Sequence, residues 1–138
     1  RRLAPLRVLI ADDNVDAATA LTLQLQLYGH EVRTVYDGEE AVVVAQSFQP
    51  QVALLDLGMP KVDGYEAARR LRADPQCAAV TLIALTGWGQ PTDRRRSSEA
   101  GFDLHLVKPV GEAELFRAIG SLTGFGLEPP GAARRPAS

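Results

Sequence analysis

Four apolar residues that end in an aspartate, Val52-Ala53-Leu54-Leu55-Asp56, form the stretch of sequence that decides the fold. A nearly continuous apolar run of this length is typical of a strand buried on both faces of a parallel sheet. Three further runs also end in a polar or charged side chain. They are residues 6–11 before Asp12 and Asp13, residues 80–85 before Thr86, and residues 102–107 before Lys108.

Segments with helical periodicity separate these runs. Ala41, Val44, Ala45 and Phe48 lie at i, i+3, i+4 and i+7, which predicts a helix that Pro50 ends. Comparable stripes are Ala18, Leu21, Leu25 and Tyr28 before Gly29; Tyr65, Ala68 and Leu71 before Asp74-Pro75; and Leu115, Ala118, Ile119 and Leu122. With a short strand at residues 31–36, strands and helices alternate, which predicts an α/β fold with a doubly wound parallel sheet.

Residues 91–100 form an unusual segment of the alternating pattern. They should form the fourth helix, with Pro91 tolerated in its first turn, but they contain almost no apolar stripe. A helix that is polar all round is solvent-exposed, bound to a partner, or marginally stable. We therefore expect it to be the least stable helix and part of an output surface.

The composition narrows the class of protein. A length of 138 residues fits one domain, and a net charge of −2 gives no electrostatic case for binding nucleic acid or an anionic membrane. The single cysteine excludes an intrachain disulfide and fits a reducing compartment. The sequence does not begin with Met, so we expect a piece of a longer protein. His30, in a turn after Gly29, is expected on the surface.

The side chains that end the runs should meet in space, because the carboxyl ends of parallel strands share one edge of a sheet. Clustered carboxylates repel each other and persist when a hard cation such as Mg²⁺ neutralises them. A carboxylate is also a nucleophile toward phosphorus and forms an aspartyl phosphate. Lys108 would neutralise charge on the phosphoryl group, and the Thr86 hydroxyl would donate to one of its oxygens.

Each residue alone has a plainer interpretation. Asp12 and Asp13 could form a helix N-cap, with Asn14 as the competing cap. Asp56 and Thr86 could be turn residues, and Lys108 a strand exit. Their joint placement at the ends of four apolar runs favours a site.

The sequence resembles a receiver domain of two-component response regulators. The matching segments, in the order and spacing of that family over residues 6–123, are residues 11–14 (Ala-Asp-Asp-Asn), 56–64 (Asp-Leu-Gly-Met-Pro-Lys-Val-Asp-Gly), 85–87 (Leu-Thr-Gly) and 107–109 (Val-Lys-Pro). The resemblance implies a flavodoxin-like (βα)5 fold with strand order 2-1-3-4-5. It also implies a signalling switch rather than an enzyme that turns over substrate, with self-dephosphorylation as the reaction of its own site.

The resemblance also implies a role for each site residue. Asp56 is the phosphoacceptor. Asp13, Asp56 and the backbone carbonyl of Gly58 are the protein ligands of Mg²⁺, and Asp12 holds the ion through water. Thr86 and Lys108 contact the phosphoryl group, and the Lys108-Pro109 peptide is cis. His105 occupies the switch position, where the family usually has Tyr or Phe; a half-exposed strand residue is the alternative. Trp88, two residues beyond Thr86, is expected to report the state of the site.

The resemblance further implies partners and context. The phosphoryl donor would be a histidine kinase or a histidine phosphotransfer domain, and a hybrid sensor histidine kinase or a free-standing receiver would be the parent protein. We expect a linker remnant at residues 1–5, the receiver at 6–123, and a tail or linker at 124–138. We expect cytoplasmic location, tethered or free, no direct contact with nucleic acid or membrane, and a dimer through the fourth helix, fifth strand and fifth helix.

Two other functions use similar chemistry. A Mg²⁺-dependent phosphatase or phosphotransferase of haloacid dehalogenase type wants a second Asp two residues after the nucleophile, where this sequence has Gly58. An interaction module that has lost phosphorylation is disfavoured by the complete set of five site residues.

Overall fold

The computed structural model describes residues 5–87 and 94–123. Within these two ranges, strands and helices alternate throughout. The strands form one parallel sheet in the order β2-β1-β3-β4-β5, as expected. The strands are β1 (Arg7–Ala11), β2 (Glu31–Val35), β3 (Val52–Asp56), β4 (Thr81–Thr86) and β5 (Leu104–Val107).

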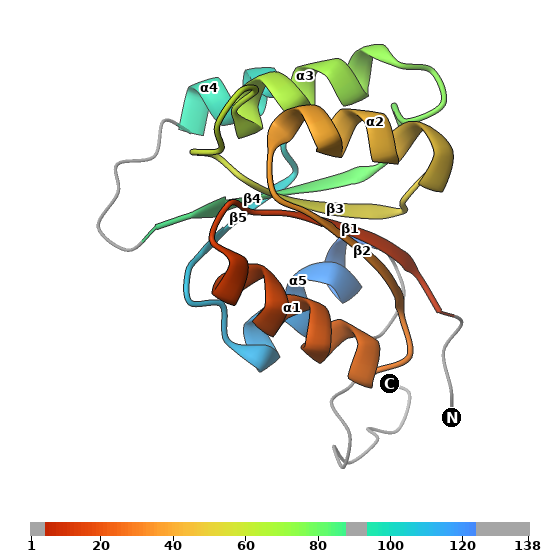
Figure 1. The fold of residues 1–138 in the computed structure, drawn as a ribbon, viewed down its shortest axis with the longest axis vertical. Coiled ribbons are helices and arrows are strands. Elements are labelled where there is room, and N and C mark those ends of the chain that lie inside the picture. Colours follow the sequence, from red (N-terminus) through yellow and green to blue (C-terminus); the bar gives the residue numbers. More distant parts are fainter. Residues whose placement is uncertain (1–4, 88–93, 124–138) are drawn as a thin grey trace.

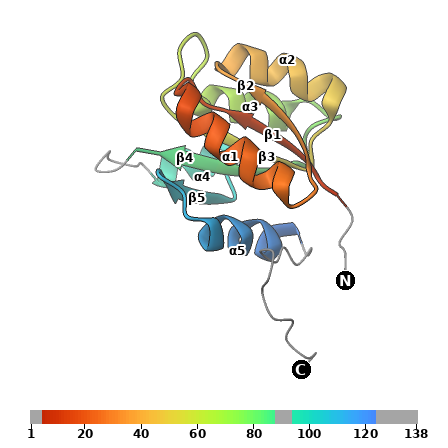
Figure 2. The same ribbon diagram turned by 60° about the horizontal axis from the view of Figure 1, so that its bottom comes forward.

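Helices cover both faces of the sheet and make a three-layer sandwich. The helices are α1 (Val15–Leu27), α2 (Gly38–Phe48), α3 (Gly64–Ala73), α4 (Arg94–Ala100) and α5 (Glu112–Thr123). Figure 1 shows α2, α3 and α4 on one face and α1 and α5 on the other, and Figure 2 shows the same layers from a second direction. This is the doubly wound arrangement that the alternation of elements predicts.

The core is divided by the sheet into two apolar layers. Alternate residues of each central strand enter alternate layers: Leu9 and Ala11 of β1 pack toward α2 and α3, whereas Val8 and Ile10 pack toward α1 and α5. The same alternation holds in β3 and β4, whose side chains are almost entirely buried. Burial on both faces explains why these strands are continuous apolar runs in the sequence.

Side-chain caps position the starts of three helices. The carboxamide oxygen of Asn14 accepts a hydrogen bond from Ala17 N (3.0 Å). Asp37 and Asp63 accept from Glu40 N (2.8 Å) and Glu66 N (2.9 Å) in the same way. Each cap satisfies one of the free N–H groups of a first turn. The N-cap of α1 is therefore Asn14, which leaves the two preceding aspartates for another purpose.

The unusual fourth helix is short. Within the described residues α4 runs from Arg94 to Ala100 and buries only Ser97 and Ala100; residues 91–93 of the expected helix lie outside the described residues. Phe102 N donates to Ser97 O (3.1 Å) in the turn that ends α4, so β5 begins at Leu104 rather than at residue 102. Two small buried side chains confirm that α4 lacks an apolar stripe.

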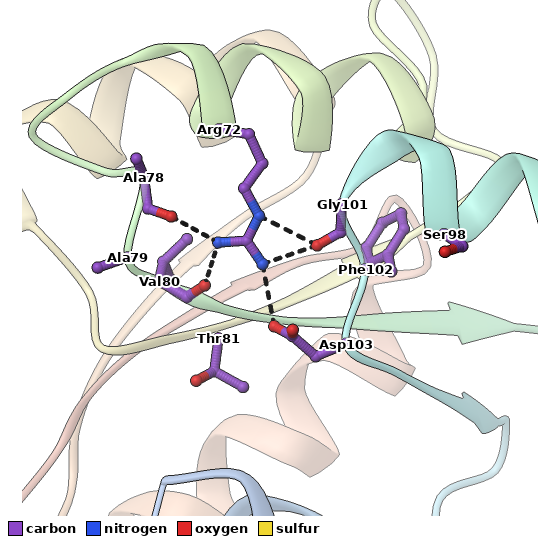
Figure 3. A pocket seen from close by; sticks show the side chains of 9 residues that line it. All are labelled: Arg72, Ala78, Ala79, Val80, Thr81, Ser98, Gly101, Phe102 and Asp103. Carbon is purple, nitrogen blue, oxygen red and sulfur yellow. Dashed lines mark hydrogen bonds and ion pairs between the residues drawn. The ribbon is translucent and has the colours of Figure 1, made fainter.

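At the amino-terminal edge of β4, Arg72 joins α3 to the segments before β4 and β5. Figure 3 shows its guanidinium inside a ring of acceptors, beside a surface pocket. It donates to the carbonyl oxygens of Ala78 (2.8 Å), Val80 (2.5 Å) and Gly101 (2.7 and 3.1 Å), and to the carboxylate of Asp103 (3.0 Å). All five N–H groups of an arginine are used by this set.

The expectation that His30 lies on the surface was wrong. His30 is 7% exposed, and its Nδ1 accepts a hydrogen bond from Leu6 N (3.0 Å), directly before β1. Burial lowers the pKa of His30, which favours the neutral ring that this hydrogen bond requires. The residue is structural and ties the end of α1 to the sheet.

Among the described residues, no helix combines the length and the apolar character that crossing a membrane requires.

Candidate phosphorylation and metal site

The register of the sheet brings the candidate residues to one edge. Ala11 pairs with Leu55, so Asp12, the next residue, is level with Asp56. Thr86 pairs with Val107, and Lys108 follows directly. Each functional side chain is therefore at or just beyond the carboxyl end of its strand, as the topology predicts.

Asp12 is the buried member of the acidic pair. It is fully buried, and its Oδ1 accepts from the backbone N–H of Asn14 (3.0 Å). Asp13, the next residue, is exposed. Because Asn14 takes the role of helix cap, neither aspartate is needed to start α1, and both carboxylates remain available to the site.

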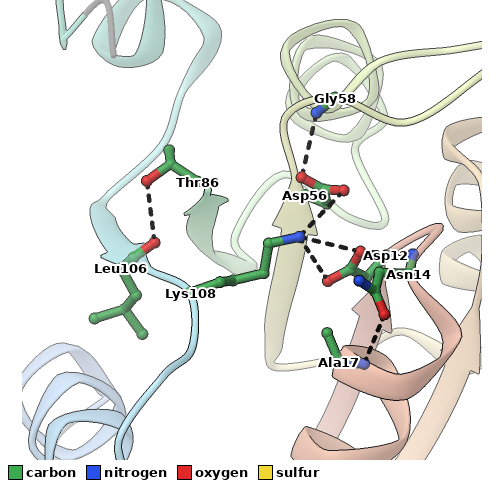
Figure 4. Close-up of polar contacts among 8 residues, drawn as sticks. All are labelled: Asp12, Asn14, Ala17, Asp56, Gly58, Thr86, Leu106 and Lys108. Carbon is green, nitrogen blue, oxygen red and sulfur yellow. Dashed lines mark hydrogen bonds and ion pairs between the residues drawn. The ribbon is translucent and has the colours of Figure 1, made fainter. Parts of the chain in front are cut away.

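Lys108 lies between two carboxylates. Its ammonium is 3.1 and 3.3 Å from the two oxygens of Asp12 and 3.5 Å from Oδ2 of Asp56. Figure 4 shows the lysine reaching from the end of β5 across the edge of the sheet to both aspartates. The side chain of Lys108 is 20% exposed, so these ion pairs are only partly screened by water.

Asp56 is a strongly perturbed carboxyl group. It is 6% exposed, and its Oδ1 accepts from Gly58 N at 3.3 Å. Burial, the charge of Asp12 and a contact with Asp13 raise the pKa of Asp56 to about 6, against the lowering influence of Gly58 N–H and Lys108. A buried carboxyl with such a pKa, held against a second carboxylate, is a candidate functional residue on physical grounds.

The three carboxylates could hold a metal ion. One oxygen from each of Asp12, Asp13 and Asp56 lies within 4.8 Å of the others. A hard divalent cation with oxygen ligands fits this donor set, because it would neutralise the charge that the single lysine leaves uncompensated. The residues present therefore suit Mg²⁺, and the exposure of Asp13 gives water access to the site.

Thr86 and the Lys108 backbone lie side by side at the ends of β4 and β5. Lys108 N donates to Thr86 O (2.7 Å), which fixes the end of β5 against the end of β4. The Thr86 hydroxyl is buried and donates to Leu106 O across a long 3.5 Å. The Lys108-Pro109 peptide is cis, as expected.

His105 is half-buried on β5 and continues a row of aromatic rings. Its ring centroid is 6.3 Å from that of Phe102, and the centroid of Phe102 is 6.4 Å from that of Tyr65 on α3. Burial, with the charge of Arg94, lowers the pKa of His105. Trp88 lies outside the described residues, so the structure does not test its expected role.

Sequence reasoning missed one conformation next to the site. Lys61 has a positive φ of 66° in the loop between β3 and α3. Lysine does not favour the positive-φ region of the backbone, so the sequence contained no local signal that predicts this conformation.

Comparison with known proteins places the chain in a family. Residues 8–120 match the model of the response regulator receiver domain. The chain is 40% identical over 119 residues to the gliding motility regulatory protein of Myxococcus xanthus, covering 86% of this chain and 15% of that protein. It is 34% identical to the PilH protein of Pseudomonas aeruginosa, covering 84% of this chain and 96% of PilH.

The solved structure of a relative contains a metal ion in the corresponding kind of site. The receiver domain of a Pseudomonas aeruginosa sensor histidine kinase, with a magnesium ion coordinated in its active-site cleft, superposes with a TM-score of 0.80 at 34% identity and covers 88% of this chain and 99% of that one. The chain belongs to the response regulator receiver domains, a family of regulatory phosphoacceptor domains.

The fraction of each relative's length that this chain covers differs widely. The chain spans less than a sixth of the Myxococcus protein and about half the length of several transcriptional regulators that it also matches.

Proposed function

We propose that this domain accepts a phosphoryl group from a phosphohistidine onto Asp56, with Mg²⁺ bound by Asp13, Asp56 and the carbonyl of Gly58, and with Asp12 holding the ion through water. The observation that carries the proposal is the raised pKa of a buried Asp56 between two further carboxylates and one lysine. Bound Mg²⁺ would supply charge neutralisation for phosphoryl transfer.

The other roles in phosphoryl transfer belong to side chains of the protein. Asp56 is the nucleophile that attacks phosphorus, and it must be ionised, so the cation has to overcome the burial that raises its pKa. Lys108 neutralises charge on the transferred group, and the Thr86 hydroxyl turns from Leu106 O to a phosphoryl oxygen. That movement vacates space beside β5, and we propose His105 as the residue that fills it.

Self-dephosphorylation is the further reaction that we propose for this site. Apart from Gly58 itself and its two neighbours in the chain, no described protein atom lies within 4 Å of the position where a Cβ of Gly58 would be. This open space beside Asp56 supports access for a water molecule to the phosphorylated aspartate.

The test is phosphorylation by a small donor. Acetyl phosphate and Mg²⁺ should add one phosphoryl group to the protein, observed by intact mass, and Asp56→Asn should abolish it. Asp63→Asn is the matched control, because an asparagine can still cap α3. An adduct that survives in Asp56→Asn would overturn the assignment.

For the phosphodonor we propose docking along α1. Val15, Leu23 and Leu27 are 55%, 59% and 73% exposed, and with the exposed Thr19 they form an i, i+4 row that begins two residues after Asp13. An exposed and largely apolar helix face next to the acidic cluster supports a helical phosphohistidine partner. Leu23→Asp should slow transfer from that partner and leave acetyl phosphate phosphorylation unchanged.

We also propose the wider context from the family. The domain acts in the cytoplasm, where ATP-dependent kinases supply phosphohistidine, as part of a hybrid kinase or as a free-standing regulator, and it makes no direct contact with nucleic acid. Self-association would use the α4-β5-α5 face, where Val107 is 44% exposed. Sedimentation before and after phosphorylation tests this face, and Val107→Asp should prevent the association.

A further inference from the structure

The start of α2 lies against the loop that follows the phosphoacceptor. A methyl group on Gly38 would overlap the carbonyl oxygen of Val62 and lie 2.7 Å from its carbonyl carbon. Gly38 does not have a positive φ, so its backbone conformation does not require glycine. The close approach of the Val62 backbone does.

The loop against which Gly38 packs is strained. Val62 N donates to Pro60 O (2.8 Å), which closes a three-residue γ-turn around Lys61 with its positive φ of 66°. Turns of this kind are rare, and they persist when the surrounding structure holds them. Here the loop is held by Gly64 N, which donates to Leu57 O (3.1 Å), and by the buried side chain of Val62 in the core.

Asp37 adds a second contact between α2 and the loop. Its Oδ1 caps α2, while its Oδ2 is 3.6 Å from the ammonium of Lys61. The Asp37 side chain is 14% exposed and that of Lys61 is 63% exposed. The cap and the first residue of α2 thus hold both the backbone and the central side chain of the turn.

The same loop carries Gly58, whose N–H already binds Asp56. We propose that Asp37 and Gly38 are positioning residues for the metal site: they hold the strained turn at 60–62 and thereby fix the Gly58 backbone beside Asp56. This inference rests on the proposed function, because it takes Gly58 as a Mg²⁺ ligand. Neither residue touches the metal; both act through the loop.

The decisive experiment compares Mg²⁺ affinity with stability. Gly38→Ala should weaken Mg²⁺ binding, measured by calorimetry, by about tenfold, as is typical when a group supporting a metal ligand is displaced. Ala45→Gly is the matched control, because it destabilises the same helix about two turns beyond the close approach of Gly38 to Val62. It should lower the urea midpoint and leave Mg²⁺ affinity unchanged.

A second variant tests the side-chain contact without changing the helix cap. Asp37→Asn should retain the bond from Glu40 N and weaken Mg²⁺ binding by about two- to threefold, the scale of a partly exposed ion pair. Glu39→Gln removes one charge from the same helix turn and should have no such effect. Equal effects of the two would mean long-range electrostatics and would overturn the role of Asp37.

Hydrogen exchange provides a readout without metal. The amides of Gly58 and Val62 should exchange faster in Gly38→Ala and not in Ala45→Gly.

If Gly38→Ala folds and binds Mg²⁺ as the wild type does, the inference fails while the proposed function stands. If Gly38→Ala does not fold, Asp37→Asn against Glu39→Gln decides. If the wild type and Asp56→Asn bind Mg²⁺ equally, the proposed function itself fails.

Discussion

The two edges of the sheet both contain buried or half-buried charges, and they treat them in opposite ways. At the amino-terminal edge, Arg72 uses every N–H group, and Asp103 also accepts from Leu82 N (2.8 Å). At the carboxyl-terminal edge, one lysine faces the carboxylates of Asp12 and Asp56, and Asp13 adds a third charge. The first edge is balanced, whereas the second has an excess of negative charge.

This difference separates a structural network from a functional one. A buried charge with all its partners in place holds elements together, and it is costly to break. An unbalanced cluster lowers stability, and proteins keep such clusters where chemistry requires them. The sheet in this domain therefore has a stabilising edge and a reactive edge, which mutations should distinguish.

Removing Arg72 should produce the largest effect. Arg72→Ala leaves three carbonyl groups and the carboxylate of Asp103 without their charged donor, so the free energy of unfolding should fall by about 3 kcal/mol or more. Urea unfolding measures this change. Arg70→Ala, which removes an exposed ion pair with Glu66, should change it by no more than about 0.5 kcal/mol. Equal losses would show that the network is not structural.

The reactive edge should become less favourable to folding as pH rises. The pKa of Asp56 is about 6 in the folded protein against an ordinary value of 3.8, so the folded state binds more protons across that window. The free energy of unfolding should therefore fall by roughly 1–3 kcal/mol as pH rises from about 4 to about 7 without Mg²⁺. Asp56→Asn should remove this component and be the more stable protein at neutral pH. If the difference in free energy of unfolding between the wild type and Asp56→Asn does not change with pH, Asp56 is not the origin of the pH dependence.

Mg²⁺ should restore the charge balance. At about ten times its dissociation constant the ion should raise the free energy of unfolding by about 1.4 kcal/mol at mildly alkaline pH. Asp13→Ala should abolish that gain if Asp13 is a direct carboxylate ligand, as we propose, and the fold should persist because Asp13 is exposed. Urea curves with and without Mg²⁺ provide the measurement; an undiminished gain in Asp13→Ala would exclude it as a ligand.

The smallest change in stability should come from His30, which lies at the balanced edge. Its pH dependence should be opposite to that of Asp56, because its contribution is lost as pH falls. Burial lowers the pKa of His30, so the unfolded chain takes up its proton first as pH falls below about 6.5, and this part of the stability is lost there. His30→Gln in the Asp56→Asn background isolates it. Between about pH 7 and about pH 5.5, the free energy of unfolding should fall less in the double variant than in Asp56→Asn. If the two proteins show the same dependence on pH, His30 does not contribute in this way.

Local sequence patterns predicted the reactive edge well. Asp12, Asp56, Thr86 and Lys108 follow apolar runs directly, and strands of a parallel sheet end at a common edge, so topology alone brings these residues together. Their electrostatic setting, including the raised pKa of Asp56, depends on burial and distance and had to come from the structure.

The balanced edge could not be predicted in the same way. Arg69, Arg70 and Arg72 look equivalent in the sequence, and only the packing of α3 on the sheet brings Arg72 to the carbonyl groups before β4 and β5. His30 lies in a turn that looks exposed, yet it receives its hydrogen bond from a backbone N–H group 24 residues earlier in the chain. Nonlocal partners of this kind leave no periodic pattern in the sequence.

The ammonium of Lys108, which lies between Asp12 and Asp56, acts as an internal counterion for these two buried carboxylates. Under the proposed ligand set, Mg²⁺ and the lysine share the carboxylate of Asp56, so the metal affinity would include the free energy of changing the Lys108–Asp56 ion pair. A phosphoryl group on Asp56 would place a further anion within reach of the same ammonium. In the proposed function, the cation that balances the two aspartates before phosphorylation is thus also the one that would contact the phosphoryl group.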